Sequence, residues 1–101
     1  MANYILFTNV TNKNGTSVLM SLSSSFIGYY WEKFNPTQLH LKANSNSLLI
    51  IEFSVADASF SLHNWLIGEF VKALDYVDSK TYVLPQLPAV GGTQAYISNI
   101  T

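Results

Sequence analysis

The apolar residues of this chain change their spacing once, and this change constrains the fold more than any other feature. Up to about residue 55, apolar and polar residues largely alternate, which is typical of strands with one buried face. Between about 60 and 77, apolar residues recur every three to four positions, which is typical of an amphipathic helix. We therefore expect strands first and then a helix capped by Asp57 or Ser59. The apolar arc of this helix comprises Leu62, Leu66, Phe70, Ala73, Leu74 and Val77.

The first part of the chain is expected to form an antiparallel meander. A strand over residues 4–10 is followed by Asn14-Gly15, a pair typical of a two-residue hairpin turn. A long second strand over 18–31 contains three consecutive serines and Gly28, which indicate a bulge or a sharp bend. This bend would let one long strand serve two halves of a curled sheet.

Two further strands complete the meander before the helix. In residues 39–43, Leu39 and Leu41 alternate with His40, which indicates one solvent-facing side. Residues 48–55 begin with an apolar run, so this strand is expected to be central in the sheet or covered on both sides. The predicted fold class is α+β and mainly β: a strongly bent antiparallel sheet or small open barrel of about five strands, with one amphipathic helix after the fourth strand.

The last part of the chain, from about residue 81 to 101, is predicted to be an arm that contains proline and glycine. It ends in a predicted strand over 94–100. This strand can pair within its own chain or with an exposed edge of a neighbouring subunit, and the sequence leaves both arrangements open. The length of 101 residues fits one small-barrel domain over 1–101.

The small number of charged residues restricts the classes of function. Only 11% of the residues are charged, the net charge is −1, and the chain has no arginine and no cysteine. Such a surface lacks the clustered cations of a nucleic-acid-binding protein and the repulsion that keeps monomers apart. The longest apolar runs are about five residues, too short to span a bilayer, and the N-terminus lacks the basic region of a signal peptide. We therefore expect a soluble intracellular protein.

Candidate catalytic groups are few. Of the two histidines, His40 is interpreted as a plain surface residue on the polar side of its strand. His63 falls within the apolar arc of the helix and is interpreted as a buried, hydrogen-bonded residue or a polar contact in a subunit interface. Neither has a metal-ligand spacing, and no pattern indicates a nucleophile, so no enzyme, metal or cofactor is predicted. Glu52 stands in an apolar strand and must find a partner or face solvent.

An aromatic run follows the predicted bend of the second strand. We interpret it, together with His63, as a possible interface or ligand surface, since large aromatic side chains are frequent interface anchors. The same aromatic faces could alternatively stack on nucleic-acid bases or sugars. The residues of this predicted surface are Phe26, Tyr29, Tyr30, Trp31, Phe34 and His63.

The element order and three stretches of the chain carry a resemblance. Residues 7–10, 65–74 and 81–85, within this order of elements, resemble the short uncharacterised proteins encoded by marine tailed phages and found in ocean metagenomes. Some of those proteins are similar in fold to Sm-like small barrels, which commonly form rings. The resemblance implies a phage-encoded, virion-associated protein. In Sm proteins the helix precedes the strands, whereas here it follows them, and their characteristic nucleic-acid-binding residues are not recognisable.

Together these features predict a non-enzymatic structural or assembly protein. It is expected to form a homo-oligomer through edge strands and aromatic contacts, with itself and other virion proteins as partners. The alternative is an Sm-like module that binds single-stranded nucleic acid or another extended polymer, although the low charge argues against nucleic acid.

Overall fold

The chain is mainly β with one helix. The computed structural model describes residues 2–8, 10, 17–21, 29–43, 46–76 and 80–101. The elements, in chain order, are β1 (Tyr4–Phe7), β2 (Val18–Ser21), β3 (Tyr30–Asn35), β4 (Gln38–Ala43), β5 (Asn46–Phe53), α1 (Ser61–Leu74), β6 (Thr81–Val83), β7 (Ala89–Val90), β8 (Thr93–Gln94) and β9 (Ile97–Ile100).

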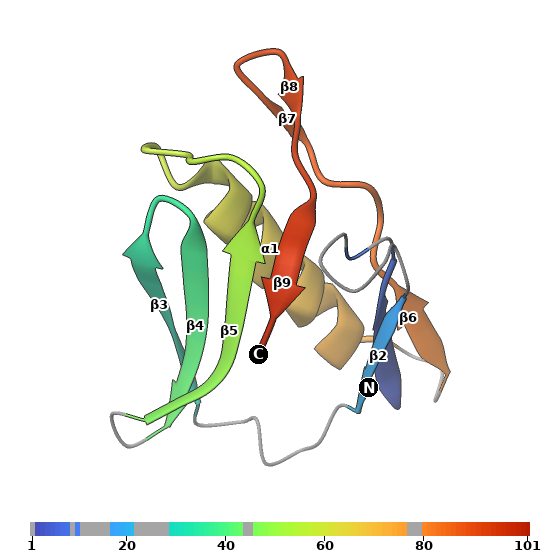
Figure 1. Ribbon diagram of the computed structural model, residues 1–101. Coiled ribbons are helices and arrows are strands. Elements are labelled where there is room, and N and C mark those ends of the chain that lie inside the picture. The colour runs from blue at the N-terminus through green and yellow to red at the C-terminus, as the bar shows by residue number, and fades with distance from the viewer. Residues whose placement is uncertain (1, 9, 11–16, 22–28, 44–45, 77–79) are drawn as a thin grey trace.

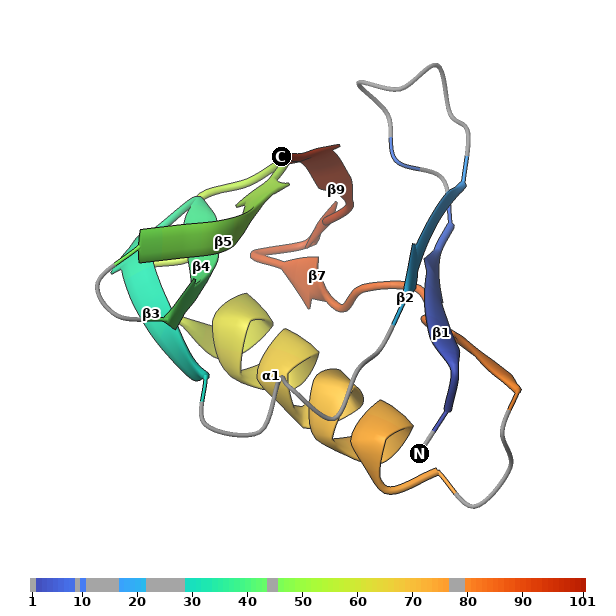
Figure 2. The same cartoon turned by 90° about the horizontal axis from the view of Figure 1, so that it is seen from below.

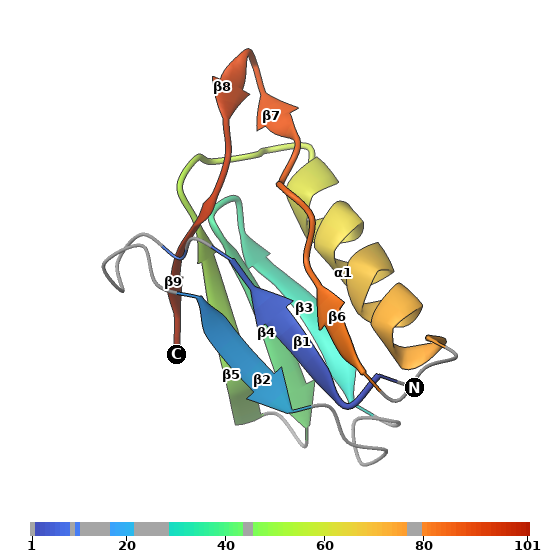
Figure 3. The ribbon, with the colours of Figure 1, turned by 90° about the vertical axis from the view of Figure 1, so that its right-hand side faces the viewer.

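The described strands form two main sheets and a small hairpin (Figure 1). The first sheet has the order β3-β4-β5-β9 and is antiparallel throughout. The second has the order β2-β1-β6, in which β1 pairs antiparallel with β2 and parallel with β6. Figure 3 shows the two sheets one in front of the other, with α1 running beside both.

The predicted mainly β class with antiparallel sheets and one helix is confirmed, but several details differ. The strands do not close into a barrel. The β1–β6 pair is parallel, because the chain passes through the other sheet and α1 between these two strands, and such a crossover permits parallel pairing. The position of β5 between β4 and β9 confirms the predicted central strand, although Leu48 at its start is exposed.

The helix follows the fifth strand of the structure rather than the fourth. The predicted second strand is divided between β2 and β3, which belong to different sheets. This division agrees with the expectation that the segment serves two halves of the fold. The serine run and Gly28, where the bend was expected, lie outside the described residues, as does the predicted Asn14-Gly15 turn.

One apolar core joins α1 to both sheets. The predicted arc of the helix is confirmed at Leu62, Leu66, Phe70 and Ala73, which are buried, while Val77 lies outside the described residues. The ring of Phe70 is 5.9 Å from Phe7 in β1 and 4.7 Å from Trp31 in β3, measured between ring centroids. This ring therefore touches both sheets at the centre of the molecule.

Glu69 is an exception to the helical pattern, since it lies outside the predicted apolar arc but is buried. Its Oε2 accepts a hydrogen bond from the hydroxyl of Tyr82 in β6, and its Oε1 accepts one from Nζ of Lys72 at 3.1 Å. Burial, together with the contact to Glu69, raises the pKa of Tyr82 to about 12. These partners satisfy a carboxylate that amphipathic spacing alone places in water.

The N-cap residue of the helix is Phe60, so neither predicted N-cap residue occupies that position. Phe60 has a left-handed backbone with φ of 60°, which is unusual for a residue other than glycine. Asp57, which lies three residues before Phe60, instead bonds to the first turn of the helix. Its Oδ2 accepts the backbone N–H of Leu62 at 2.8 Å, and its Oδ1 accepts the hydroxyl of Ser59 at 2.7 Å. Asp57 therefore satisfies the helical amide that an N-cap side chain would satisfy.

Replacing Asp57 by alanine is expected to lower the free energy of unfolding by about 0.5–2 kcal/mol at neutral pH, the range measured for lost helix caps. The hydrogen bond from Ser59 and that from the Leu62 amide hold the pKa of Asp57 below its ordinary value. The stabilisation is therefore present above the ordinary carboxyl range and is lost as pH falls through the lowered pKa. Urea unfolding at neutral and acidic pH measures both effects.

The matched control is Asp75→Ala, which removes an exposed carboxylate at the other end of the helix and should change stability by less than about 0.5 kcal/mol. An Asp57→Ala protein with the stability of the parent at neutral pH would contradict the capping role.

The C-terminal strand pairs within its own chain. β9 lies beside β5, with Ile51 opposite Ile100 and Phe53 opposite Ile97, and the backbone of Thr101 exchanges two hydrogen bonds with Ile50. The arm that leads to it contains the β7–β8 hairpin, which turns at Gly91 and Gly92 with φ of 57° and 82°. Figure 1 shows this hairpin projecting from the body of the molecule.

Candidate functional site

The four-stranded sheet has one face that packs on the core and one that neither α1 nor the three-stranded sheet covers (Figure 2). Leu39, Leu41, Ile51 and Phe53 point to the core. The alternate positions form the opposite face, which we call the outer face. Figure 2 shows α1 and the three-stranded sheet on the same side of the four-stranded sheet, so the outer face points away from both. Its residues are Tyr30, Glu32, Phe34, Gln38, His40, Lys42, Ser47, Ile50 and Glu52.

A chain of hydrogen bonds crosses the outer face from β5 to β4 and back. Nε2 of Gln38 donates to Oε1 of Glu52 at 2.9 Å. Nε2 of His40 lies 3.0 Å from Oε1 of Gln38, and Nδ1 of His40 lies 3.1 Å from Oγ of Ser47. A carboxylate only accepts, so Gln38 turns its N–H to Glu52 and its oxygen to His40, and Nε2 of His40 donates to that oxygen. Nδ1 of His40 and the Ser47 hydroxyl form the next hydrogen bond of the chain.

His40 is buried, which corrects its interpretation as a plain surface residue: only 6% of it is exposed. The ring of Phe34 in the neighbouring strand stacks on it, with a centroid distance of 4.2 Å and an interplanar angle of 9°. The alternation in β4 correctly places His40 on the face away from the core. It does not reveal that a side chain from the next strand covers the histidine.

The charged residues of β3 and β4 on this face are paired with each other. Nζ of Lys42 lies 2.7 Å from Oε2 of Glu32. This hydrogen bond raises the pKa of Lys42 above its ordinary value. Because its charge is balanced by Glu32, Lys42 adds little positive potential for binding phosphate.

The structure divides the predicted aromatic surface. Tyr30 and Phe34 are 48% and 54% exposed, and both lie on the outer face. Trp31 lies between them in sequence but points to the core, where it meets Phe70 edge to face. Tyr29 is half-buried just before β3, and Phe26 lies outside the described residues. Two of the six predicted residues are therefore together on one surface.

His63 is fully buried in α1, away from the outer face. Its Nε2 lies 2.9 Å from the backbone oxygen of Asn35 and 3.1 Å from that of Gln38, so it ties the helix to the β3–β4 turn. Its ring meets those of Phe53 and Phe60 edge to face. Of the two interpretations, the described contacts fit the buried, hydrogen-bonded residue.

Sequence reasoning missed Gln38 and Ser47 as members of the site. It identified Glu52 as a charge that needs a partner but could not name one. The short β4–β5 connection could have identified the partner of Glu52. A hairpin at this point places Gln38 directly opposite Glu52, as the register shows. A bulge at Leu41–Lys42 then shifts the pairing, so that Ser47 comes opposite Lys42 and within reach of His40.

Among the described residues, no group of three histidine, aspartate or glutamate side chains could hold a metal ion. In the same part of the chain, no helix has the length and apolar character needed to cross a membrane. No protein-family model, curated protein or solved structure matches the chain.

Proposed function

We propose that the protein is a structural or assembly protein that forms a homo-oligomer through its outer face and the adjoining strand edge. The observation that carries this proposal is the pair of exposed aromatic side chains, Tyr30 and Phe34, on one open sheet face. Large aromatic residues exposed on a surface are typical anchors of protein interfaces.

The hydrogen-bond chain supports the proposal because it fixes the position of Phe34. Both ring nitrogens of His40 are hydrogen-bonded, and Phe34 stacks on that immobilised ring. An anchor that is already ordered loses little side-chain entropy when a partner covers it. The hydrogen-bond chain therefore holds Phe34 in a position where a partner can contact its ring.

The electrostatics of the face also favour association. Glu32 and Lys42 neutralise each other, which leaves the carboxylate of Glu52, hydrogen-bonded to Gln38, as the net charge of the face. A second copy that approaches the same face therefore meets one like charge, on a chain whose total net charge is only −1.

The edge of the sheet supplies a second means of contact. β3 carries both exposed aromatic residues and is the outermost strand of its sheet. Its outward backbone groups can pair with the same edge of another copy, which would continue the sheet and bring the two aromatic pairs together.

The expected result is a discrete oligomer of the full chain at tens of micromolar in sedimentation velocity. Phe34→Gln and Tyr30→Gln should each raise the dissociation constant at least about tenfold, since truncating an interface anchor costs on the order of 2 kcal/mol. Tyr4→Gln, which alters an exposed aromatic residue of β1, is the matched control and should leave the mass unchanged.

A monomeric parent protein at these concentrations would overturn the assembly proposal. Measuring its affinity for short single-stranded RNA and DNA at two salt concentrations tests the alternative. Micromolar binding that weakens steeply with salt and is lost in Phe34→Gln would favour a nucleic-acid-binding module instead.

A further inference from the structure

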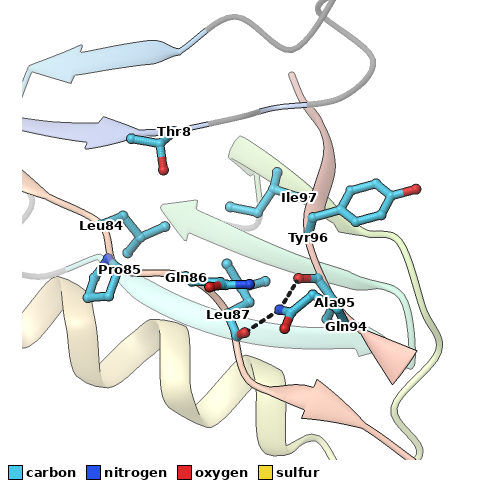
Figure 4. A pocket seen from close by; sticks show the side chains of 9 residues that line it. All are labelled: Thr8, Leu84, Pro85, Gln86, Leu87, Gln94, Ala95, Tyr96 and Ile97. Carbon is cyan, nitrogen blue, oxygen red and sulfur yellow. Dashed lines mark hydrogen bonds between the residues drawn. The ribbon is translucent and has the colours of Figure 1, made fainter. Parts of the chain in front are cut away.

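A pocket of about 290 Å³ lies on a different part of the molecule from the outer face. Its walls come from the end of β1, from the extended segment after β6 and from the segment between β8 and β9 (Figure 4). The volume equals that of about ten water molecules in the liquid, which is enough for one side chain and its flanking peptide groups. It is lined by Thr8, Leu84, Pro85, Gln86, Leu87, Gln94, Ala95, Tyr96 and Ile97.

The pocket forms where two paired strands separate. β1 and β6 pair in parallel up to Leu6 and Val83, and the amide of Leu84 still donates to the oxygen of Leu6 at 2.9 Å. Pro85 has no N–H with which to continue the ladder, and the chain turns away toward β7. Thr8 and Gln86 thus lie on opposite sides of the opening, with Leu84 and Ile97 beside it, as Figure 4 shows.

The far wall is held in place by hydrogen bonds. Nε2 of Gln94 donates to the backbone oxygens of Leu87 and Ala95, which ties the two chain segments together. The backbone oxygen of Tyr96 accepts the amide of Ser54 at 2.8 Å. These bonds make the pocket a preformed site that needs little ordering when it is filled.

The lining selects the chemistry of a ligand. Among the described residues no charged side chain lines the pocket, and Leu84, Leu87, Ala95 and Ile97 supply buried apolar surface. Within the described part of the chain, no hydrogen bond involves Thr8 or Gln86, so their backbone and side-chain groups are available at the opening.

We propose that this pocket binds a short, uncharged, extended peptide segment with one aliphatic side chain. The aliphatic group lies on the apolar lining, and the flanking peptide N–H and C=O groups pair with Thr8 and Gln86 where the β1–β6 ladder stops. Addition of an extended peptide to unpaired strand backbone is a common mode of peptide recognition, in which the main chain gives affinity and a side-chain pocket gives specificity. The site is independent of the outer face.

The test uses blocked tripeptides with the full chain, followed by amide chemical shifts in nuclear magnetic resonance. Acetyl-Gly-Leu-Gly-amide should bind saturably, with a dissociation constant on the order of millimolar, and shift the amides of Thr8, Gln86 and Ile97. The Asp and Lys analogues should bind at least about tenfold more weakly, because a charge placed among uncharged groups loses its hydration without gaining a partner.

Thr8→Val keeps the shape of the side chain and removes its hydroxyl, so it should weaken binding of the leucine peptide about three- to tenfold. Thr93→Val, in the exposed β7–β8 hairpin outside the pocket, is the control and should not change binding. Shifts that do not saturate, equal binding of the charged analogues, or an unchanged affinity in Thr8→Val would each overturn the proposal. Equal affinity for 3-methylbutanol would also overturn it, because the pocket would then bind only the apolar group.

Discussion

Phe70→Ala is expected to lower the free energy of unfolding by about 3–5 kcal/mol, the range typical of large aromatic truncations in a core. The Phe70 side chain is 4% exposed and contacts Phe7 of one sheet and Trp31 of the other. Its removal leaves a cavity at the junction of three elements, where no neighbour can close the space without moving a sheet. In a domain of ordinary stability, about 5–15 kcal/mol, this loss is a large fraction of the total.

Thermal unfolding followed by circular dichroism measures the effect. The neighbouring Val71 is the matched control, since it is exposed on the same helix and Val71→Ala should change stability by less than about 0.5 kcal/mol. If Phe70→Ala unfolded at the temperature of the parent protein, the described helix face would not be the core face.

The periodic parts of the fold could be predicted from sequence because one face of each element is buried. The arc through Leu62, Leu66 and Phe70 repeats at helical spacing and is buried as expected. Alternation likewise placed Leu39 and Leu41 on the core side of β4. Burial of one face imposes a period on the sequence, so these features are readable without knowing the tertiary partners.

Features that depend on a contact between distant segments could not be read in this way. Glu69 lies outside the apolar arc of α1 but is covered by Tyr82, which follows it by 13 residues and lies in β6. His40 has a polar-face position but lies under Phe34 from the neighbouring strand. Asp57 acts on the helix through a turn whose shape depends on the left-handed backbone of Phe60. In each case the burial or the hydrogen bonding of the residue depends on a neighbouring group that the spacing of apolar residues does not specify.

The same reasoning explains why the site was only partly predicted. The run from Phe26 to Phe34 was recognised as aromatic, but a strand turns successive side chains to opposite faces, so Tyr30 and Trp31 cannot share a surface. Composition identified the residue types, and the pleat of β3 decided which of them reach solvent.

Deleting residues 97–101 is expected to abolish cooperative folding. The deletion removes β9 from the edge of the four-stranded sheet and exposes Ile51 and Phe53, which lie opposite Ile100 and Ile97. Two buried isoleucines are lost, each contributing about 1.5–3 kcal/mol, together with the ladder to β5. The total is comparable to the whole stability of a domain this size, so the truncated chain should show no sigmoidal thermal transition.

Two single substitutions separate the stability contributed by the buried side chains of β9 from the stability contributed by its backbone pairing with β5. Ile97→Ala keeps the strand and should cost about 2–5 kcal/mol, whereas Ser98→Ala, at a half-buried position in the same strand, should cost much less. The sequence alone allowed the last strand to belong to a neighbouring subunit. If the truncated chain kept its fold and only its oligomeric mass fell, β9 would act between subunits in solution, and its pairing with β5 would be exchanged between copies.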